Sequence, residues 1–431
     1  MKKAIALLVA LFISTPVLGA SIISDTEIQS VIGDLIEPVV SAANLDVART
    51  KLHIVADDDF NAFVMGGEDV YIYTGLLTRI KTPNALRAVV AHELGHTIGG
   101  HMAQLSERMA AEMKRTMLIQ ALGLGLMVAG GNSSLGAGVM AGATGIARQS
   151  VLSFSRDEER MADNLGLDLM VRANYDPKGF VEVFEQMRDM TGYTETKINP
   201  NNVNHPLTSE RLANVREKIA GLKDNQKYKS DKQIKPRYDL VRAKLIGYLD
   251  NFDRVKTLYP YSDKSDAAIY ARAIANMRGG NLSGATVGAK TLVSRDSKNP
   301  YFYELLGDIE YKYGHYDDSV IAYEKALEIL RSAPQIETAL ALVLAERNKP
   351  GDKERATELC KKSLLVSPEP MTYFVLARTY GEQDGRFDWA MAEYYVMQKN
   401  MDKAKQHARR AKQRLNPESP EYIKSNDILK N

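Results

Sequence analysis

The fold of this chain is decided by residues 83–96, which read PNALRAVVAHELGH. Apolar residues recur there at helical spacing and a proline occupies the first turn, so we predict a helix. Residues four apart lie on one face of a helix, about 5–6 Å apart at Cβ, so His92 and His96 can hold one metal ion together. Glu93 would then take the proton of an attacking water. This spacing is typical of zinc peptidases, and with only seven histidines in 431 residues a chance match is improbable.

A catalytic zinc site needs a third protein ligand, with water in the fourth position. His101 follows His96 by five residues, one position short of the third histidine in the metzincin pattern. We therefore interpret His101 as a residue at the end of the helix. A buried hydrogen-bonding role is the alternative.

A second predicted helix supplies better candidates. Ser155 and Glu158 have the spacing of a capping box, so we expect a helix to begin after Ser155. Glu159 and Asp163 then share one face of that helix. One carboxylate of such a pair can bind metal while the other orients a ligand imidazole. The alternative is an ordinary acidic helix start, but the HELGH motif favours the metal site.

Three segments together resemble the zinc metallopeptidase family of HtpX and the CAAX prenyl proteases. They are HELGH at 92–96, SRDEERMADNLG at 155–166 and NHPLTSER at 204–211. The resemblance implies that Glu159 is the third ligand, that Asp163 supports the site from outside the ligand set, and that Arg211 is an active-site arginine. It also implies one Zn²⁺ per chain, held in a gluzincin-type α+β domain with a small sheet.

Two roles that exclude each other in any one state are open for His205, and the resemblance implies the first of them. His205 would cap the zinc of the resting enzyme as an inhibitory fourth ligand, or else His205 or Arg211 would stabilise the oxyanion that develops during cleavage. The loop over 199–204 has few apolar anchors, and Pro206 restricts His205 to extended conformations. We favour the inhibitory role, and the residues alone leave both open.

The N-terminal residues have the pattern of a secretion signal. Two lysines precede an apolar run over 4–13, and small residues follow at 19–20. The run is too short to span a bilayer, so we predict a signal peptide over 1–20 and a periplasmic protein. A single cysteine, Cys360, excludes an internal disulfide. A net charge of +2 without a basic stripe argues against nucleic-acid binding.

Residues 116–147 contain no charged side chain, and the run GGNSS at 130–134 interrupts them. Each arm is too short to cross a bilayer. Two interpretations stay open. The stretch is either a flap or hairpin beside the active site that makes peripheral contact with the membrane surface, or a hairpin buried in the core.

The C-terminal half has the pattern of a helical repeat. Residues 303–307 (YELLG), with Ser319, Tyr323 and Ala326, follow the 34-residue tetratricopeptide template. A stack of amphipathic helices without repeat function is the alternative. We predict a mostly α protein with a peptidase domain over 21–222, a polar linker over 223–235 and an α-solenoid of tetratricopeptide repeats over 236–431.

We therefore expect a periplasmic zinc endopeptidase that acts on unfolded or misassembled polypeptides, especially outer-membrane proteins. Its repeats would bind substrates or the outer-membrane assembly machinery. The alternative is a chaperone or adaptor of outer-membrane protein assembly, in which binding dominates and proteolysis is minor. The presence of Glu93 favours the enzyme, because a purely structural zinc has no need of that carboxylate.

Overall fold

The computed structural model describes residues 12–17, 20–66, 69–101, 103–105, 107–108, 111, 114, 154–191, 205, 208–222 and 227–430. Three segments of the sequence-based predictions lie outside these residues. They are residues 1–11 of the predicted signal peptide, the uncharged stretch 116–147, and the loop 199–204 with Pro206. Both interpretations of 116–147 therefore stay predictions.

The chain divides into two compact units, which we describe separately. The site unit comprises residues 33–53 and 58–235, and the repeat unit comprises residues 1–32, 54–57 and 236–431. The predicted domain boundaries stay predictions. Among the described residues, no helix has both the length and the apolar character that crossing a bilayer requires.

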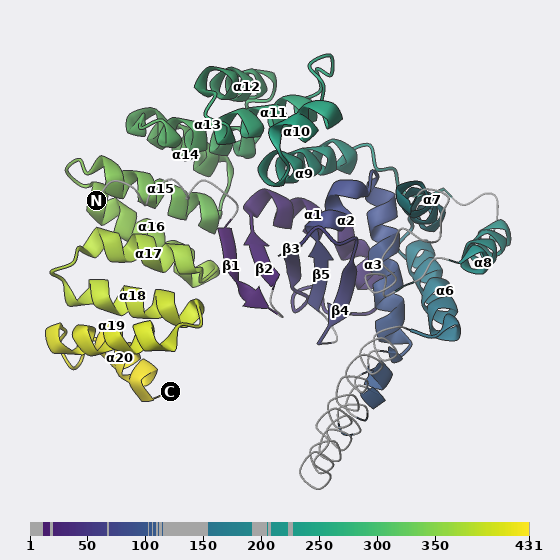
Figure 1. The fold of residues 1–431 in the computed structure, drawn as a ribbon, viewed down its shortest axis with the longest axis horizontal. Coiled ribbons are helices and arrows are strands. Elements are labelled where there is room, and N and C mark those ends of the chain that lie inside the picture. Colours follow the sequence, from purple (N-terminus) through teal and green to yellow (C-terminus); the bar gives the residue numbers. More distant parts are fainter. Residues whose placement is uncertain are drawn as a thin grey trace, which may run out of the picture. The chain divides into compact units, whose positions relative to one another are not determined.

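A small sheet contains the strands, in the order β1-β2-β3-β5-β4 (Figure 1). The strands are β1 (Phe12–Val17), β2 (Ala20–Ser24), β3 (Leu52–Ala56), β4 (Ala62–Met65) and β5 (Asp69–Tyr73). In the site unit, β4 pairs antiparallel with β5, with Ala62 opposite Ile72 and Val64 opposite Val70. Because β4 is the last strand in the order, it forms an edge of the sheet.

Helix α3 (Pro83–Ile98) is the central helix of the site unit, and it packs against α6, α7 and β4. The other helices described there are α2 (Thr74–Arg79), α6 (Arg156–Arg172), α7 (Gly179–Thr191), α8 (Ser209–Ala220) and the end of α1 (Thr26–Ala42). A Cβ on Gly95 would lie only 2.5 Å from the carbonyl oxygen of Ala162. The glycine of HELGH therefore lets α3 and α6 approach closely, which brings their polar faces together.

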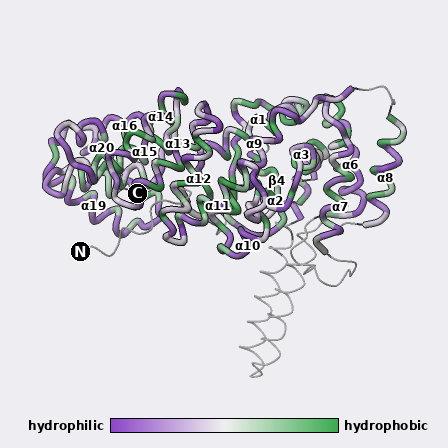
Figure 2. Tube along the Cα trace, turned by 90° about the horizontal axis from the view of Figure 1, so that it is seen from above, coloured by the Kyte–Doolittle hydropathy of each residue, from purple (hydrophilic) through white to green (hydrophobic). Residues whose placement is uncertain are grey.

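The repeat unit is a run of helices, and each helix after the first packs against the next. They are α9 (Ile234–Leu249), α10 (Phe252–Leu258), α11 (Asp266–Arg278), α12 (Leu282–Arg295), α13 (Pro300–Lys312), α14 (Tyr316–Ile329), α15 (Pro334–Arg347), α16 (Asp352–Val366), α17 (Pro370–Tyr380), α18 (Gly385–Met397), α19 (Met401–Arg414) and α20 (Pro420–Lys430). Hydrophobic and hydrophilic residues alternate along these helices (Figure 2).

The template residues Ser319, Tyr323 and Ala326 are all buried, as are Ala285 and Ala289 one repeat earlier. Small buried residues let paired helices pack closely. The predicted mostly α fold with a small sheet and a repeat solenoid is therefore confirmed.

One buried lysine holds several carboxylates together inside the repeat unit. Lys244 Nζ lies 2.7 Å from Asp25 Oδ2, 3.3 Å from Glu27 Oε2 and 3.0 Å from Glu304 Oε2. Tyr270 donates a hydrogen bond of 2.8 Å to Glu27. A buried cation with several acidic partners stays charged, so this cluster ties Asp25 and Glu27 to the repeat helices α9, α11 and α13.

Candidate metal centre

Local signals fix the register of both helices that supply the site. The Thr82 side chain accepts a hydrogen bond of 3.1 Å from the Ala85 N–H, so α3 begins at Pro83. Ser155 and Glu158 form the predicted capping box: the Ser155 hydroxyl accepts from the Glu158 N–H, and the Glu158 carboxylate accepts from the Ser155 N–H. Helix α6 therefore begins at Arg156.

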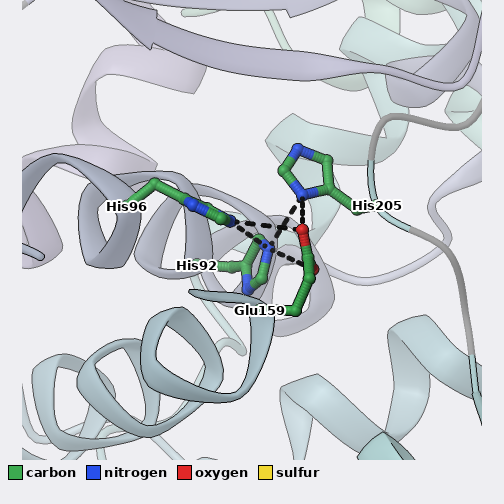
Figure 3. Close-up of side chains that lie close together, drawn as sticks. All are labelled: His92, His96, Glu159 and His205. Atoms are coloured by element: carbon green, nitrogen blue, oxygen red, sulfur yellow. Dashed lines mark hydrogen bonds and ion pairs between the residues drawn. The ribbon is translucent and has the colours of Figure 1, made fainter. Parts of the chain in front are cut away.

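Four side chains converge between these helices, and all four could hold one metal ion (Figure 3). His92 and His96 come from α3, Glu159 comes from α6, and His205 lies outside the helices. One ligand atom from each lies within 4.8 Å of all the others. His92, His96 and Glu159 are buried, and His205 is partly buried. All four are candidate site residues predicted from the sequence.

The spacing of the donor atoms fits zinc. Ligands 2.0–2.2 Å from a tetrahedral zinc lie about 3.3–3.6 Å apart. His92 Nε2 lies 3.2 Å from His96 Nε2, 3.3 Å from His205 Nδ1 and 3.5 Å from Glu159 Oε2. His205 Nδ1 is closer to Glu159 Oε1, at 2.7 Å, which is a hydrogen-bond distance. Imidazole nitrogens and a carboxylate oxygen are also the donor types that zinc binds.

Asp163 and Arg211 contact two of the donor residues, His92 and Glu159 respectively. Asp163 Oδ1 is 2.9 Å from His92 Nδ1, the ring nitrogen that faces away from the cluster. Arg211 donates from Nε and Nη2 to the two oxygens of Asp163, each at 2.8 Å. Arg211 Nη1 lies 2.7 Å from Glu159 Oε2. The buried guanidinium thus bridges the two carboxylates of α6.

Two further residues lie near the donor atoms: His101, for which the sequence left a buried hydrogen-bonding role open, and Phe154, to which it assigned no role. His101, interpreted as a helix-end residue, is buried with its Nδ1 3.0 Å from His96 Nδ1, as the alternative role required. The Phe154 ring stacks on the His205 ring, with centroids 5.4 Å apart. It also lies 3.9 Å from the His96 ring, centroid to centroid. The spacing of residues along the sequence predicts neither the contact of His101 nor the contacts of Phe154.

Burial and neighbouring charges perturb the pKa values of the site. Burial opposes protonation of His92, but Asp163 and Glu159 outweigh it and raise its pKa to about 9. Burial lowers the pKa of His96, and the nearby His92 and His205 lower it further. Burial alone would raise the pKa of Glu159, but hydrogen bonds with His205 and His92 hold it well below its usual range. An ionised Glu159 and a neutral His96 are the forms that bind a metal ion.

Glu93 stands between the donor cluster and an apolar pocket. Burial raises the pKa of its carboxyl group, and His205 and His92 oppose that shift. Its Oε1 lies 3.5 Å from His205 Nε2. The pocket encloses about 600 Å³, including its open mouth. Its polar lining consists of Asn61, His92, Glu93, Asp163, His205 and Arg211. Its apolar lining consists of Phe60, Ala62, Leu76, Ala88, Val89, Phe180, Val183, Phe184 and Met187.

The chain is similar to several known proteins. Residues 23–219 match the model of peptidase family M48. The chain is 24% identical over 401 residues to the beta-barrel assembly-enhancing protease of Escherichia coli (strain K12), covering 90% of this chain and 79% of that protein. It is 28% identical over 179 residues to the metalloprotease YcaL of the same organism, covering 41% and 65% respectively. Among solved structures, a tetratricopeptide protein of Thermus thermophilus matches at a TM-score of 0.24 and 17% identity, covering 45% of this chain and 92% of that one.

Proposed function

Because this chain is a zinc metalloendopeptidase with a peptidase family M48 domain, we propose that it cleaves unfolded or misassembled polypeptides. The observation that carries the proposal is the buried group of His92, His96 and Glu159, with Glu93 beside an apolar pocket. We propose that these three residues bind one Zn²⁺ ion. Bound zinc supplies a Lewis acid that polarises the peptide carbonyl and lowers the pKa of a water molecule.

Glu93 is the proposed general base. It would accept the proton of the attacking water and deliver it to the leaving amine. A carboxylate whose pKa is raised by burial is a stronger base than an exposed one, which suits this task. Asp163 would keep the His92 ring in the orientation that turns Nε2 toward the metal, as its distance of 2.9 Å from Nδ1 supports.

We propose that His205 is an inhibitory fourth ligand in the resting enzyme. Its Nδ1 lies among the other donors, 3.3 Å from His92 Nε2, where a catalytic zinc keeps the position for water or substrate. Its other nitrogen lies near Glu93, so the ring stands between the base and the metal ligands. The alternative, that His205 stabilises the oxyanion, makes the opposite prediction for the basal rate.

Arg211 is proposed to act in two ways. Its contacts with Asp163 and Glu159 support a role in holding both carboxylates in place. Its side chain also lines the pocket, where a cation can meet the oxyanion of a bound peptide.

The apolar pocket and the edge strand support an unfolded substrate. An extended polypeptide can add to β4 by backbone hydrogen bonds, because β4 is at the edge of the sheet. Ala62 of β4 also lines the pocket, so the same segment would place one side chain against Phe180 and Met187. Unfolded proteins offer both an extended backbone and exposed apolar side chains, whereas folded proteins bury them.

We propose a periplasmic location and substrates among outer-membrane proteins. The support is the similarity over 90% of the chain to a protein named beta-barrel assembly-enhancing protease. The repeat unit would bind substrates or the outer-membrane assembly machinery through the surfaces of its stacked helices. A chaperone or adaptor that depends on this unit is the second candidate, and it requires no peptide cleavage.

The test is zinc-dependent cleavage of a permanently unfolded protein, such as reduced and alkylated casein, by the purified chain. Cleavage should stop after metal removal with a chelator and return with one equivalent of Zn²⁺. A folded protein of similar size serves as the control substrate. A zinc-loaded chain that leaves casein and unfolded outer-membrane proteins intact, yet keeps them from aggregating, would favour the adaptor.

A further inference from the structure

His101 lies against His96 on the side that faces away from the donor cluster. His101 Nδ1 is 3.0 Å from His96 Nδ1, and the two residues are 3% and 1% exposed. His96 turns its other nitrogen, Nε2, toward His92 Nε2 at 3.2 Å and Glu159 Oε1 at 3.6 Å. We propose that His101 is a positioning residue that accepts the Nδ1–H of His96 and so keeps Nε2 available to the metal. This inference rests on the proposed zinc-binding role of His96.

A neutral imidazole has a single N–H, and this decides which of the two histidines donates the hydrogen bond. Only the nitrogen without a proton can bind a metal. If His96 gives Nε2 to zinc, its proton is on Nδ1 and needs an acceptor in this buried place. His101 Nδ1 is at the correct distance to accept it. The proton of His101 is then on Nε2, which lies 3.2 Å from Met161 Sδ, a weak acceptor.

The backbone before His101 is shaped to bring its ring back under α3. Gly99 is the C-cap of that helix, and Gly100 has a φ of +72°, a conformation that favours glycine. A Cβ on Gly99 would lie 2.8 Å from both Cε1 and Nε2 of His101. Two adjacent glycines therefore make the turn and leave the space that the ring occupies. This observation is independent of the histidine contact and points to the same arrangement.

Two substitutions separate the hydrogen bond from simple packing. His101→Leu fills a similar volume without an acceptor, whereas His101→Asn carries an oxygen close to the position of Nδ1. We expect His101→Leu to weaken zinc affinity by about 10–100-fold, the effect typical of losing a residue that orients a ligand. His101→Asn should stay near the affinity of the unsubstituted chain. Affinity is measured on the full chain by competition with a chelator, without reference to activity.

The visible spectrum of the Co²⁺-loaded chain gives a second readout, because it reports the geometry of the ligands. His101→Leu should change this spectrum and His101→Asn should preserve it. Gly99→Ala should behave like His101→Leu, since the added methyl group displaces the ring. Met161→Leu is the matched control: it changes the neighbour of Nε2, leaves the contact between the two Nδ1 atoms, and should leave zinc affinity unchanged.

Unchanged zinc affinity and an unchanged Co²⁺ spectrum in His101→Leu would overturn the proposal. Equal losses in His101→Leu and His101→Asn would also overturn it, because the acceptor would then not matter. If His101→Leu fails to fold, His101→Gln replaces it. Its oxygen lies nearer the position of Nε2, so zinc binding as tight as that of His101→Asn contradicts the inference. Failure of the unsubstituted chain to bind zinc is a separate result that rejects the proposed function itself.

Discussion

Asp163 holds the outer nitrogen of His92: its Oδ1 lies 2.9 Å from His92 Nδ1, while both its oxygens accept from Arg211. The carboxylate therefore links a proposed metal ligand on α3 to a guanidinium on α8. Arg211 and burial act against each other on this group: burial would raise the pKa of Asp163, and its bonds with Arg211 and His92 keep it low. An ionised Asp163 is the form that accepts a hydrogen bond from His92.

This arrangement predicts an order of effects on metal affinity. Asp163→Asn should weaken zinc binding by about 10–100-fold, because it removes an outer partner of a ligand. Glu159→Ala should weaken it further, because it removes a ligand. Glu158→Ala is the control, since Glu158 caps α6 and pairs with Arg108 at 2.9 Å. Chelator competition measures all three, and a larger loss in Glu158→Ala than in Glu159→Ala would contradict the assignment.

Glu93→Gln should keep the metal and lose the activity. The substitution removes the proposed base without removing a ligand, so casein cleavage should fall by about 10²–10⁴-fold, the range for loss of an acid–base group. Metal analysis of the same preparation should still give one zinc per chain. Partner capture by the repeats should survive, which separates cleavage from binding. Near-normal turnover in a preparation free of contaminating protease would reject Glu93 as the base.

Gly95→Ala should damage the site through the packing of α3 on α6. The added Cβ would lie 2.5 Å from the Ala162 carbonyl oxygen, so the helices must separate and carry Glu159 away from His92 and His96. We expect lower stability and weaker zinc binding. Gly33→Ala in α1 is the matched control, because nothing lies within 4 Å of its added Cβ. That change should be neutral or should raise the free energy of unfolding by up to about 1 kcal/mol.

The same packing explains what the sequence can and cannot predict. The spacing of His92, Glu93 and His96 determines their common face, because register within one helix is fixed. The capping box at Ser155 fixes the register of Glu159 and Asp163 in the same way. The position of His101 depends on a turn with a positive φ at Gly100, and the contacts of Phe154 depend on tertiary packing. Neither feature produces a periodic pattern in the sequence, so neither can be predicted from it.

Lys244→Met should destabilise the repeat unit and make its stability depend on pH. It leaves Asp25, Glu27 and Glu304 buried without their cation, which costs about 3–5 kcal/mol for a broken buried ion pair. Burial already raises the pKa of Glu27. A carboxyl group with a raised pKa binds more protons in the folded state, so stability falls as pH rises above the ordinary carboxyl value of 4.5. The loss should therefore be larger at pH 8 than at pH 5.

Urea denaturation of the full chain at both pH values measures this effect. Lys325→Met is the control, because Lys325 pairs with Glu328 on the surface and such pairs contribute about 0–1 kcal/mol. A Lys244→Met chain as stable as the control at pH 8 would show that the cluster does not hold Asp25 and Glu27 to the repeats.

His205→Ala distinguishes the two roles of that histidine by the sign of its effect. Its Nδ1 lies 2.7 Å from Glu159 and 3.3 Å from His92 Nε2, among the proposed ligands. If the ring occupies the position that substrate oxygen needs, its removal opens the site and raises basal casein cleavage, including cleavage of the chain by itself. If the ring stabilises the oxyanion, its removal lowers turnover by about 10²–10³-fold. His315→Ala, an exposed histidine of the repeat unit, should change neither rate. We expect the rise, because the ring is already hydrogen-bonded to Glu159, a proposed metal ligand, and would occupy the fourth position of the proposed site. A fall in the basal rate would require the inhibitory role to be abandoned.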